Sequence, residues 1–274
     1  AFRRHFYQHA GFRYVESDTP VIIKDNNYET EPAAVQYLEF HYGKSYFNLE
    51  NFPKKCAELA VQICKEKGIE LGRALDLGCA VGRTTYELAK LGFKEAVGLD
   101  LSARFFQLAV KLKDQGKVRY ALPEEGDIVE FKEIELSKLG YEDIKDRVTF
   151  YQQDVSNLDL KKFNSFDLVF AGDLIETMKY PKMLLTMIHK LLNPNGILVL
   201  TTSNNWSTKV TAKDQWVGGF KKDGENYTTY EGLSQILKEN FVQIKEPHDV
   251  QYVARETARK FHFTFTQVTY WQRK

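Results

Sequence analysis

The sequence is poor in cysteine and carries almost no net charge. Its 274 residues include three cysteines, Cys56, Cys64 and Cys79, which supply neither a disulfide framework nor a metal-ligand cluster. We therefore expect no metal site. The 38 lysines and arginines nearly balance the 37 aspartates and glutamates, for a net charge of +1. Nothing in this balance favours nucleic acid or an anionic membrane as a partner.

Long apolar runs are also missing. No stretch approaches the ~20 consecutive apolar residues that a membrane-spanning helix needs. The hydrophobic content of 43% and the charged content of 27% are ordinary for a globular protein. We expect a cytoplasmic protein that acts on a small molecule.

From Arg73 onward the pattern alternates between short apolar strands and amphipathic helices. Strands are predicted at 73–77, 95–100, 147–152, 166–171 and 196–202, and helices at 81–91, 102–115 and 180–192. This alternation predicts parallel pairing with right-handed crossovers. Two further strands, at 241–245 and 261–271, are joined by a short connection and are predicted to pair antiparallel. The expected fold is α/β, a doubly wound and mostly parallel seven-stranded sheet with an antiparallel C-terminal edge.

The other segments are assigned by composition. Helices are predicted from Glu31 to about Tyr42 and from Pro53 to Gly68, each with proline in its first turn. Residues 123–146 form an acidic insertion that we expect to be partly helical and solvated. Residues 203–228 are rich in tryptophan, glycine and lysine, and a helix at 230–239 follows them.

A glycine turn joins the first strand to its helix in the stretch ALDLGCAVGRTTYEL, residues 74–88. A phosphate-binding loop of the Walker type would have Lys-Ser/Thr after its last glycine, but Arg83 and Thr84 follow Gly82. The first glycine pair of the dinucleotide fingerprint is missing as well. The spacing D-x-G-x-x-x-G, from Asp76 to Gly82, is instead the pattern of S-adenosylmethionine-dependent methyltransferases.

That pattern fits a ligand that ends in an amino acid. Glycines let the backbone approach the ligand, and Asp76 at the strand end is placed to receive the ammonium group of the cofactor. The amides around Arg83, at the start of the helix, favour the cofactor carboxylate.

Acidic residues also follow the next two strands. Asp100 ends the second strand and is predicted to accept hydrogen bonds from a ribose diol. Asp154, after the third strand, is predicted to bind the adenine amino group while Val155 packs on the ring. Each signal alone is as well explained by a tight turn, but open sheets bind ligands at this edge, and three signals occur there in the right order. The predicted cofactor-binding residues are Asp76, Gly78, Cys79, Ala80, Gly82, Arg83, Asp100, Leu101, Asp154, Val155 and Ala171.

The fourth strand ends in AGDLIE, residues 171–176. Methyltransferases that act on the amino groups of nucleobases carry Asn/Asp-Pro-Pro-Tyr at this place. Methylation of a nucleobase amine is therefore not expected.

Several stretches resemble one specific family. They include YLEFHYG at 37–43, RALDLGCAVGR at 73–83, WVGGF at 216–220 and RETARKF at 255–261. Together they resemble the C-terminal methyltransferase domain of the bifunctional ovothiol-biosynthesis enzyme. The resemblance implies methyl transfer from S-adenosylmethionine to an imidazole nitrogen of 5-thiohistidine (4-mercaptohistidine), with S-adenosylhomocysteine as product, as the last step of ovothiol A biosynthesis.

The resemblance also implies a domain arrangement. Residues 1–26 are expected to be the tail of an upstream iron-dependent sulfoxide synthase domain and a linker, and residues 27–274 the methyltransferase domain, with an aromatic lid at about 203–228. The synthase domain of the same polypeptide is the expected partner. Two alternatives stay open: another small histidine-like acceptor, or a catalytically silent cofactor-binding module of the synthase.

An amino-acid acceptor needs a cation and an anion that converge on it. Arg255 suits its carboxylate through a bidentate fork, and Glu256 or Asp173 suits its ammonium group. The alternative for Arg255 and Glu256 is a surface ion pair on an edge strand.

Aromatic residues of the long connection are predicted to close the site, or else to cover a small core cluster. The predicted catalytic residues are Asp173, Tyr28 and His41. Tyr28, Tyr37 and His41 are predicted to form the wall of the site opposite this aromatic connection. The predicted substrate-binding residues are Arg255, Glu256, Trp216, Phe220, Asn226 and Tyr37.

Overall fold

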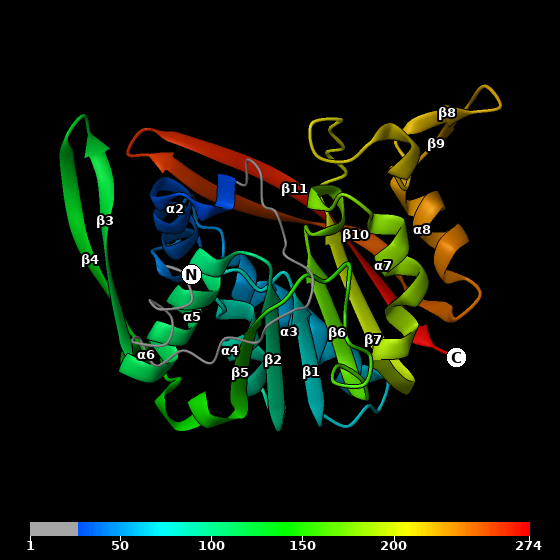
Figure 1. Ribbon diagram of the computed structural model, residues 1–274, viewed down its shortest axis with the longest axis horizontal. Coiled ribbons are helices and arrows are strands. Elements are labelled where there is room, and N and C mark those ends of the chain that lie inside the picture. Colours follow the sequence, from blue (N-terminus) through cyan, green and yellow to red (C-terminus); the bar gives the residue numbers. More distant parts are fainter. Residues whose placement is uncertain (1–26) are drawn as a thin grey trace, which may run out of the picture.

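The computed structural model describes residues 27–274, so the predicted tail at 1–26 lies outside the described residues. Within them, seven strands form one sheet in the order β10-β11-β7-β6-β1-β2-β5 (Figure 1). The parallel strands are β1 (Arg73–Leu77), β2 (Glu95–Asp100), β5 (Val148–Gln152), β6 (Phe166–Gly172) and β7 (Leu192–Thr202). At one edge β11 (Lys260–Arg273) pairs antiparallel with both β7 and β10 (Phe241–Thr257). The predicted sheet, with its antiparallel C-terminal edge, is confirmed.

Helices cover both faces of this sheet and divide its core in two. On one face lie α3 (Phe52–Glu66), α4 (Arg83–Lys90) and α5 (Ala103–Gln115); on the other lie α7 (Pro181–Met187) and α8 (Thr229–Leu237). The central strand β1 is buried on both faces, because Ala74 packs into the first core and Leu75 into the second. Such strands read as nearly continuous apolar runs, which is why the sequence located them.

The N-terminal described segment lies beside the ends of the parallel strands. It consists of a 3₁₀ turn, η1 (Asn27–Glu29), and helix α2 (Glu31–Tyr42). The side chain of Thr30 accepts a hydrogen bond from the amide of Ala33 and caps α2. In η1 the carboxylate of Glu29 accepts hydrogen bonds from the amides of Ala103 and Arg104, at 2.9 and 3.2 Å. Glu29 thus caps α5 from outside and holds η1 next to the end of β2.

The sheet order defines where a ligand can lie. Strand β1 pairs with β2 on one side and with β6 on the other, so the chain winds outward in opposite directions from this point. Leu77, at the end of β1, is in register with Leu99 of β2 and Ala171 of β6. In open α/β sheets the crevice at such a switch point, outside the carboxyl ends of the strands, is the ligand site.

The acidic insertion at 123–146 is partly helical as predicted, but its first half belongs to a β-hairpin that the sequence did not predict. Strands β3 (Lys117–Glu125) and β4 (Ile128–Glu135) pair antiparallel, and only α6 (Leu136–Leu139) and the 3₁₀ turn η2 (Glu142–Arg147) are helical. Alternation explains the strand, because Val118, Tyr120 and Leu122 are buried while their neighbours are more exposed. The charged residues between them concealed this period.

The connection at 203–228 contains regular structure too. It holds a 3₁₀ turn, η5 (Lys213–Gln215), and a small hairpin of β8 (Phe220–Lys222) and β9 (Glu225–Tyr227). Two more 3₁₀ turns, η3 (Ile175–Thr177) and η4 (Ile188–Leu191), flank α7.

Strand β10 is much longer than the predicted 241–245, whereas β11 exceeds its predicted range of 261–271 by only three residues. Only residues 267–272 of β11 pair with β7, whereas the pairing of β10 with β11 continues to Thr257 and Lys260. We call residues 248–266 the β10–β11 ribbon. It extends past the parallel strands toward α2 and the β3–β4 hairpin (Figure 1).

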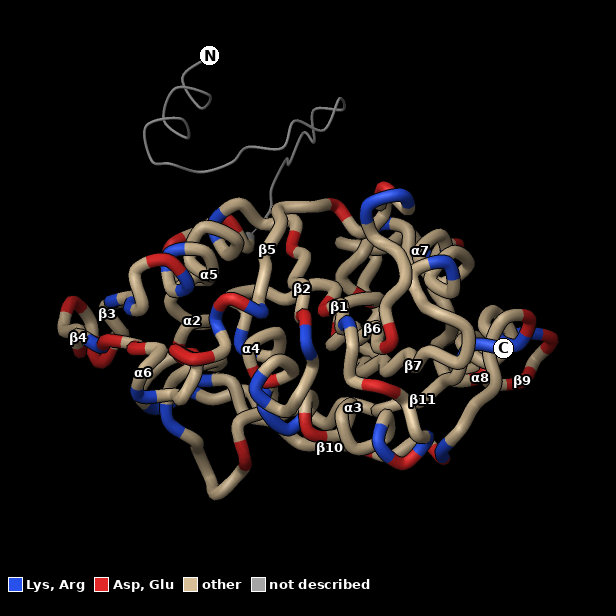
Figure 2. Tube along the Cα trace, turned by 90° about the horizontal axis from the view of Figure 1, so that it is seen from below, with Lys and Arg blue, Asp and Glu red and all other residues tan. Residues whose placement is uncertain are grey.

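Charged residues of both signs are interspersed along the chain (Figure 2), in keeping with the net charge of +1. Within residues 27–274, none of the helices has the length and apolar character to cross a membrane.

Phe166→Ala tests the core. Phe166 is fully buried in β6, so we expect the variant to lower the free energy of unfolding by about 3–5 kcal/mol. Phe131→Ala is the matched control, because Phe131 is 83% exposed on β4, and it should change that free energy by less than about 0.5 kcal/mol. Urea denaturation followed by circular dichroism measures both. Equal effects of the two substitutions would contradict the assignment of the core.

Candidate functional site

The glycine loop after β1 has backbone conformations that residues other than glycine rarely adopt. Gly78, Ala80 and Gly82 have φ angles of 72°, 48° and 92°. The amides of Gly78 and Cys79 both donate to the carbonyl of Leu99, at 2.8 and 3.0 Å, which ties the loop to β2. A Cβ on Gly82 would lie 2.6 Å from Cζ of Phe150. The second glycine of the pattern is therefore required by packing as well as by backbone conformation.

Asp100 joins this loop to the start of α5. Its carboxylate accepts hydrogen bonds from the amides of Ala80 and Ser102, both at 2.8 Å. Burial nevertheless raises the pKa of Asp100 to about 6. A ligand that donates further hydrogen bonds, as a ribose diol does, would offset this desolvation.

Asp76 lies beneath the loop rather than at its surface. It is 2% exposed, and its carboxyl group accepts a hydrogen bond from Thr85 Oγ1 at 2.7 Å. Burial, together with the nearby charge of Asp100, raises the pKa of Asp76 to about 7. The observed role of Asp76 is to hold α4 against the end of β1, and its predicted contact with the cofactor ammonium group stays a prediction.

The other predicted cofactor residues lie along the same sheet edge. Asp154 follows β5, and its side chain accepts a hydrogen bond from the amide of Ser156 at 2.8 Å. Val155 is buried beside it in the second core. Cys79 and Ala171 are buried, and Leu101 is half-buried. The structure brings together the loop, Asp100 and Asp154, but their contacts with a cofactor stay predictions.

His41 is held neutral at the end of α2. Its Nδ1 atom accepts a hydrogen bond from the amide of Arg83 at 3.3 Å, and its carbonyl accepts one from the Arg83 guanidinium at 2.8 Å. Burial, with the charge of Arg83, lowers the pKa of His41 to about 3. Because Nδ1 accepts a hydrogen bond from the backbone, the observed role of His41 is to position the first turn of α4. Its predicted place among the catalytic residues stays a prediction.

Asp173, directly after β6, is the centre of a hydrogen-bond network. Its Oδ1 atom accepts from Thr201 Oγ1 at 2.9 Å and from the hydroxyl of Thr266, and its Oδ2 accepts from the Tyr252 hydroxyl at 2.9 Å. The backbone of Asp173 has a positive φ of 44°. Such a conformation is uncommon in residues other than glycine, and it is a feature of functional sites.

Three residues of this network, Thr201, Tyr252 and Thr266, were missed by sequence reasoning. The nearby pair of Glu176 and Ser203 was missed as well. Glu176 was visible in the strand-end stretch at 171–176, and its place just after a buried parallel strand is a signal that could have identified it. Tyr252 carried none. It reaches Asp173 only because the β10–β11 ribbon is longer than the apolar pattern indicates.

Tyr28 and Tyr37 stand on the other side of the crevice. Their rings meet edge to face at 5.9 Å, and both contact the ring of Phe105. Burial raises the pKa of both tyrosines, and the charge of Asp100 contributes. They therefore stay protonated near neutral pH. The structure agrees with the predicted aromatic wall in position, while its contact with a substrate stays a prediction.

The predicted clamp of Arg255 and Glu256 is wrong as a joint site. Arg255 is 6% exposed, and its Nη2 donates to Glu124 Oε1 at 2.7 Å and to the carbonyl of Pro123 at 2.8 Å. Glu256 is exposed and contacts Lys260 and His262. The two side chains have separate partners, Arg255 on the β3–β4 hairpin and Glu256 on its own ribbon, so the structure does not bring them together.

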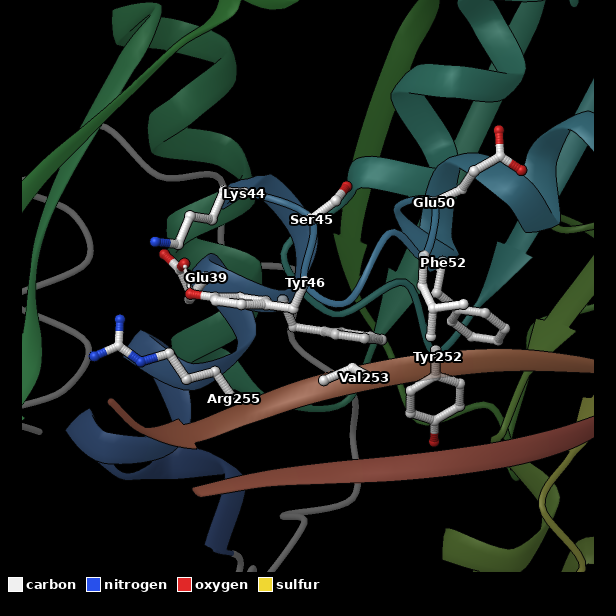
Figure 3. A pocket seen from close by; sticks show the side chains of 11 residues that line it. Glu39, Lys44, Ser45, Tyr46, Glu50, Phe52, Tyr252, Val253 and Arg255 are labelled. Atoms are coloured by element: carbon white, nitrogen blue, oxygen red, sulfur yellow. Dashed lines mark hydrogen bonds between the residues drawn. The ribbon is translucent and has the colours of Figure 1, made fainter. Parts of the chain in front are cut away.

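Arg255 also lies away from Asp173. Figure 3 shows its guanidinium extending toward Glu39 and Lys44, whereas the ring of Tyr252 points to the other side of β10. The cavity next to Arg255 has a volume of about 280 Å³ and opens between Lys44, Tyr46 and the β3–β4 hairpin. The observed partner of Arg255 is the hairpin, through Glu124.

The aromatic connection is anchored beside η3. Trp216 donates to the carbonyl of Thr211 at 2.9 Å and stacks on Trp206, and Thr211 donates to the carbonyl of Met178 at 2.7 Å.

Phe220 and Asn226 belong to the β8–β9 hairpin, which projects beyond α8 (Figure 1). Phe220 packs on Tyr227 of the same hairpin, and Asn226 is exposed. The structure does not bring these two residues together with the other predicted substrate residues, because Phe220 is paired with Tyr227 and Asn226 with Lys221 within the hairpin.

Comparison with known proteins identifies the family to which this chain belongs. A family model for a methyltransferase domain matches residues 49–240, so the chain belongs to this methyltransferase family. No curated protein matches the sequence. Among solved structures, the chain is similar to magnesium protoporphyrin IX methyltransferase from Synechocystis PCC 6803 with bound SAM, with a TM-score of 0.53 and 15% identity over 93% of this chain and 100% of that one. It is also similar to an S-adenosylmethionine-dependent methyltransferase from Clostridium acetobutylicum, with a TM-score of 0.51 and 17% identity over 82% and 92% of the two chains.

The fold is therefore that of a class I methyltransferase, and S-adenosylmethionine is the cofactor of this class. The hydrogen-bonding groups at the strand edge fit this cofactor. The loop at 78–82 presents backbone, and the buried carboxyl group of Asp100 needs hydrogen-bond donors.

Asp100→Ala should weaken cofactor binding several-fold, because the variant removes the acceptor predicted for the ribose hydroxyls. Isothermal calorimetry with S-adenosylmethionine measures the dissociation constant. Asp249→Ala, an exposed change on β10, is the control. An unchanged dissociation constant in Asp100→Ala would refute the ribose assignment.

Asp76 predicts a pH dependence of stability. Between about pH 4 and 7 the folded protein keeps a proton on Asp76 that the unfolded chain has released, because its pKa rises to about 7 on folding. The contribution of Asp76 to the free energy of unfolding must then fall as the pH rises through this range. In Asp76→Asn this contribution is absent, so over this range the wild type should lose about 1 kcal/mol or more relative to the variant, since one pKa unit corresponds to about 1.4 kcal/mol. Urea denaturation at pH 4.5 and 7.5 measures it, and identical falls in both proteins would show that Asp76 is already ionised at the lower pH.

Proposed function

We propose that this protein transfers a methyl group from S-adenosylmethionine to an imidazole ring nitrogen of 5-thiohistidine, the last step of ovothiol A biosynthesis. The resemblance of residues 37–43, 73–83, 216–220 and 255–261 to the methyltransferase domain of the ovothiol enzyme supports this acceptor. The observation that carries the proposal is the Asp173 carboxylate, which stands at the strand edge next to the cofactor loop.

Asp173 has room for one more donor. A carboxylate offers about four acceptor positions, and three are occupied by Thr201, Thr266 and Tyr252. The remaining position is on Oδ2. An imidazole N–H would fill it, and the opposite ring nitrogen would then keep its lone pair free for attack.

Orientation of this kind is what the reaction requires of the protein. Bound S-adenosylmethionine supplies a methyl group on a positively charged sulfur, which is an excellent leaving group. A neutral imidazole already has a nucleophilic lone pair, so positioning can provide most of the acceleration. As the new N–C bond forms, positive charge develops on the ring, and the negative charge of Asp173 stabilises it. Tyr252, Thr201 and Thr266 fix the carboxylate in place.

The charge of the crevice favours a cationic or N–H-rich acceptor. Asp100, Asp173 and Glu176 all follow the ends of parallel strands, and within residues 27–274 none of the three forms an ion pair with lysine or arginine. A phosphate-bearing acceptor would be repelled there. An amino acid with an imidazole ring carries donors for this set of acceptors.

The proposal includes the upstream iron-dependent sulfoxide synthase domain of the same polypeptide as partner, since that domain would produce the sulfur-bearing histidine. A catalytically silent cofactor-binding module is the competing function of another class. The hydroxyl network around Asp173 speaks against it, because cofactor binding alone gives no reason to fix a carboxylate on the acceptor side.

The test is a product assay. The purified protein is mixed with S-adenosylmethionine and synthetic 5-thiohistidine, with histidine as the control acceptor, and products are identified by mass spectrometry. We expect singly methylated 5-thiohistidine and unmodified histidine. Asp173→Asn should lower kcat about 10- to 100-fold, because its amide nitrogen or oxygen can no longer act as a charged acceptor. Binding of S-adenosylmethionine with no methylated product from 5-thiohistidine, also in the full-length fusion, would refute the proposed acceptor.

A further inference from the structure

We propose that Glu176 binds the α-ammonium group of the amino-acid acceptor and thereby selects free amino acids over deaminated analogues. This inference rests on the proposed function, which leaves the recognition of the amino-acid end of the substrate unexplained. The clamp predicted for that end, Arg255 with Glu256, does not form.

One carboxylate oxygen of Glu176 accepts hydrogen bonds within the protein, and the other does not. Oε1 accepts hydrogen bonds from the amide and the hydroxyl of Ser203, at 2.8 and 2.9 Å. Oε2 is buried and has no hydrogen-bond partner among residues 27–274. The residue as a whole is 6% exposed. A buried carboxylate oxygen without a donor is costly, and such atoms in native proteins commonly mark a ligand site.

The surroundings of Glu176 lack a positive charge. Burial raises the pKa of Glu176, and the charge of Asp173 adds to the effect. Among the described residues, no lysine or arginine contacts its carboxylate. A ligand that brings a cation would therefore favour the ionised form of Glu176.

The position of Glu176 matches the proposed acceptor. It lies in η3, three residues after Asp173, and its charge acts on both Tyr252 and Tyr28. Those two tyrosines come from opposite sides of the crevice. Glu176 therefore lies within electrostatic reach of both the Asp173 network and the aromatic wall, between which the body of a small amino acid would lie.

The geometry points to a primary ammonium group rather than another cation. The bond that Oε2 lacks requires an N–H or O–H donor, and Ser203 prevents the carboxylate from turning Oε1 toward the ligand. A quaternary ammonium group carries charge but no donor. An ammonium group supplies both, and one charge-assisted hydrogen bond is stronger than a neutral one.

The experiment compares two acceptors in two proteins. The acceptors are 5-thiohistidine and the same molecule without its α-amino group, a thioimidazole propionate. In the wild type, kcat/KM should be about 10- to 100-fold higher for 5-thiohistidine. In Glu176→Gln, KM for 5-thiohistidine should rise about 10-fold or more, KM for S-adenosylmethionine should stay constant, and the preference between the two acceptors should largely disappear.

Glu246→Gln is the matched control, because Glu246 is exposed on β10, and it should behave as the wild type. Equal kcat/KM for both acceptors in the wild type would overturn the role of Glu176, and this measurement needs no variant to fold. A preserved preference in folded Glu176→Gln would overturn it as well. Either outcome leaves the proposed function intact as long as the wild type methylates 5-thiohistidine. If the wild type methylates only a different amine-bearing acceptor, the proposed function fails, and the same comparison with that acceptor and its deaminated form decides on Glu176.

Discussion

The Asp173 carboxylate joins parts of the chain that are far apart in the sequence. Its hydroxyl partners come from β7, β10 and β11, and its own backbone follows β6. A carboxylate in a partly buried crevice is costly unless hydrogen-bond donors surround it. The donors in turn fix the β10–β11 ribbon over the ends of the parallel strands. The acceptor side of the crevice thus depends on one carboxylate and its hydrogen bonds.

The cofactor side follows a different rule, which is backbone conformation. Gly78 and Gly82 adopt positive φ angles without strain. Ala80 also adopts one, but the steric conflict of its Cβ atom makes this conformation unfavourable by about 1–2 kcal/mol. The hydrogen bond from its amide to Asp100 compensates for part of that cost. Loop, strand and helix are held together by Asp76 and Asp100, two buried carboxyl groups whose raised pKa values record the desolvation.

The sequence was informative where one physical pattern dominates. The parallel strands are buried on both faces, and their apolar runs placed β1, β2, β5 and β6 within about one residue. The cofactor residues follow those strands directly, so their positions were predictable too. The β3–β4 hairpin and the far part of β10 were not, because their alternation is interrupted by charged residues such as Glu124, which are solvent-exposed or paired across elements. Tyr252 could not be found from local pattern, since its partner is 79 residues away.

Errors at the substrate site arise where the partners of a side chain come from distant or unpredicted elements. Arg255 and Glu256 are adjacent in β10, but Arg255 pairs with Glu124 of the β3–β4 hairpin, whereas Glu256 pairs with Lys260 and His262. Phe220 and Asn226 were placed by their position after β7, but a two-stranded hairpin carries them away from the strand ends. Site residues that sit on strands of unknown register are therefore harder to assign than those that end a buried strand.

Strand β11 pairs with the parallel sheet only over its last residues, so the sequences of the ribbon and of the parallel sheet can vary independently. The family match covers residues 49–240 and includes the cofactor loop, Asp100 and Asp154. The ribbon at 248–266, with Tyr252 and Thr266, lies after that span and pairs with none of the parallel strands. Substitutions in the ribbon can reshape the acceptor wall while the parallel sheet and its cofactor crevice keep their packing. An ancestral methyltransferase could in this way exchange one acceptor for another without first losing its ability to bind the methyl donor.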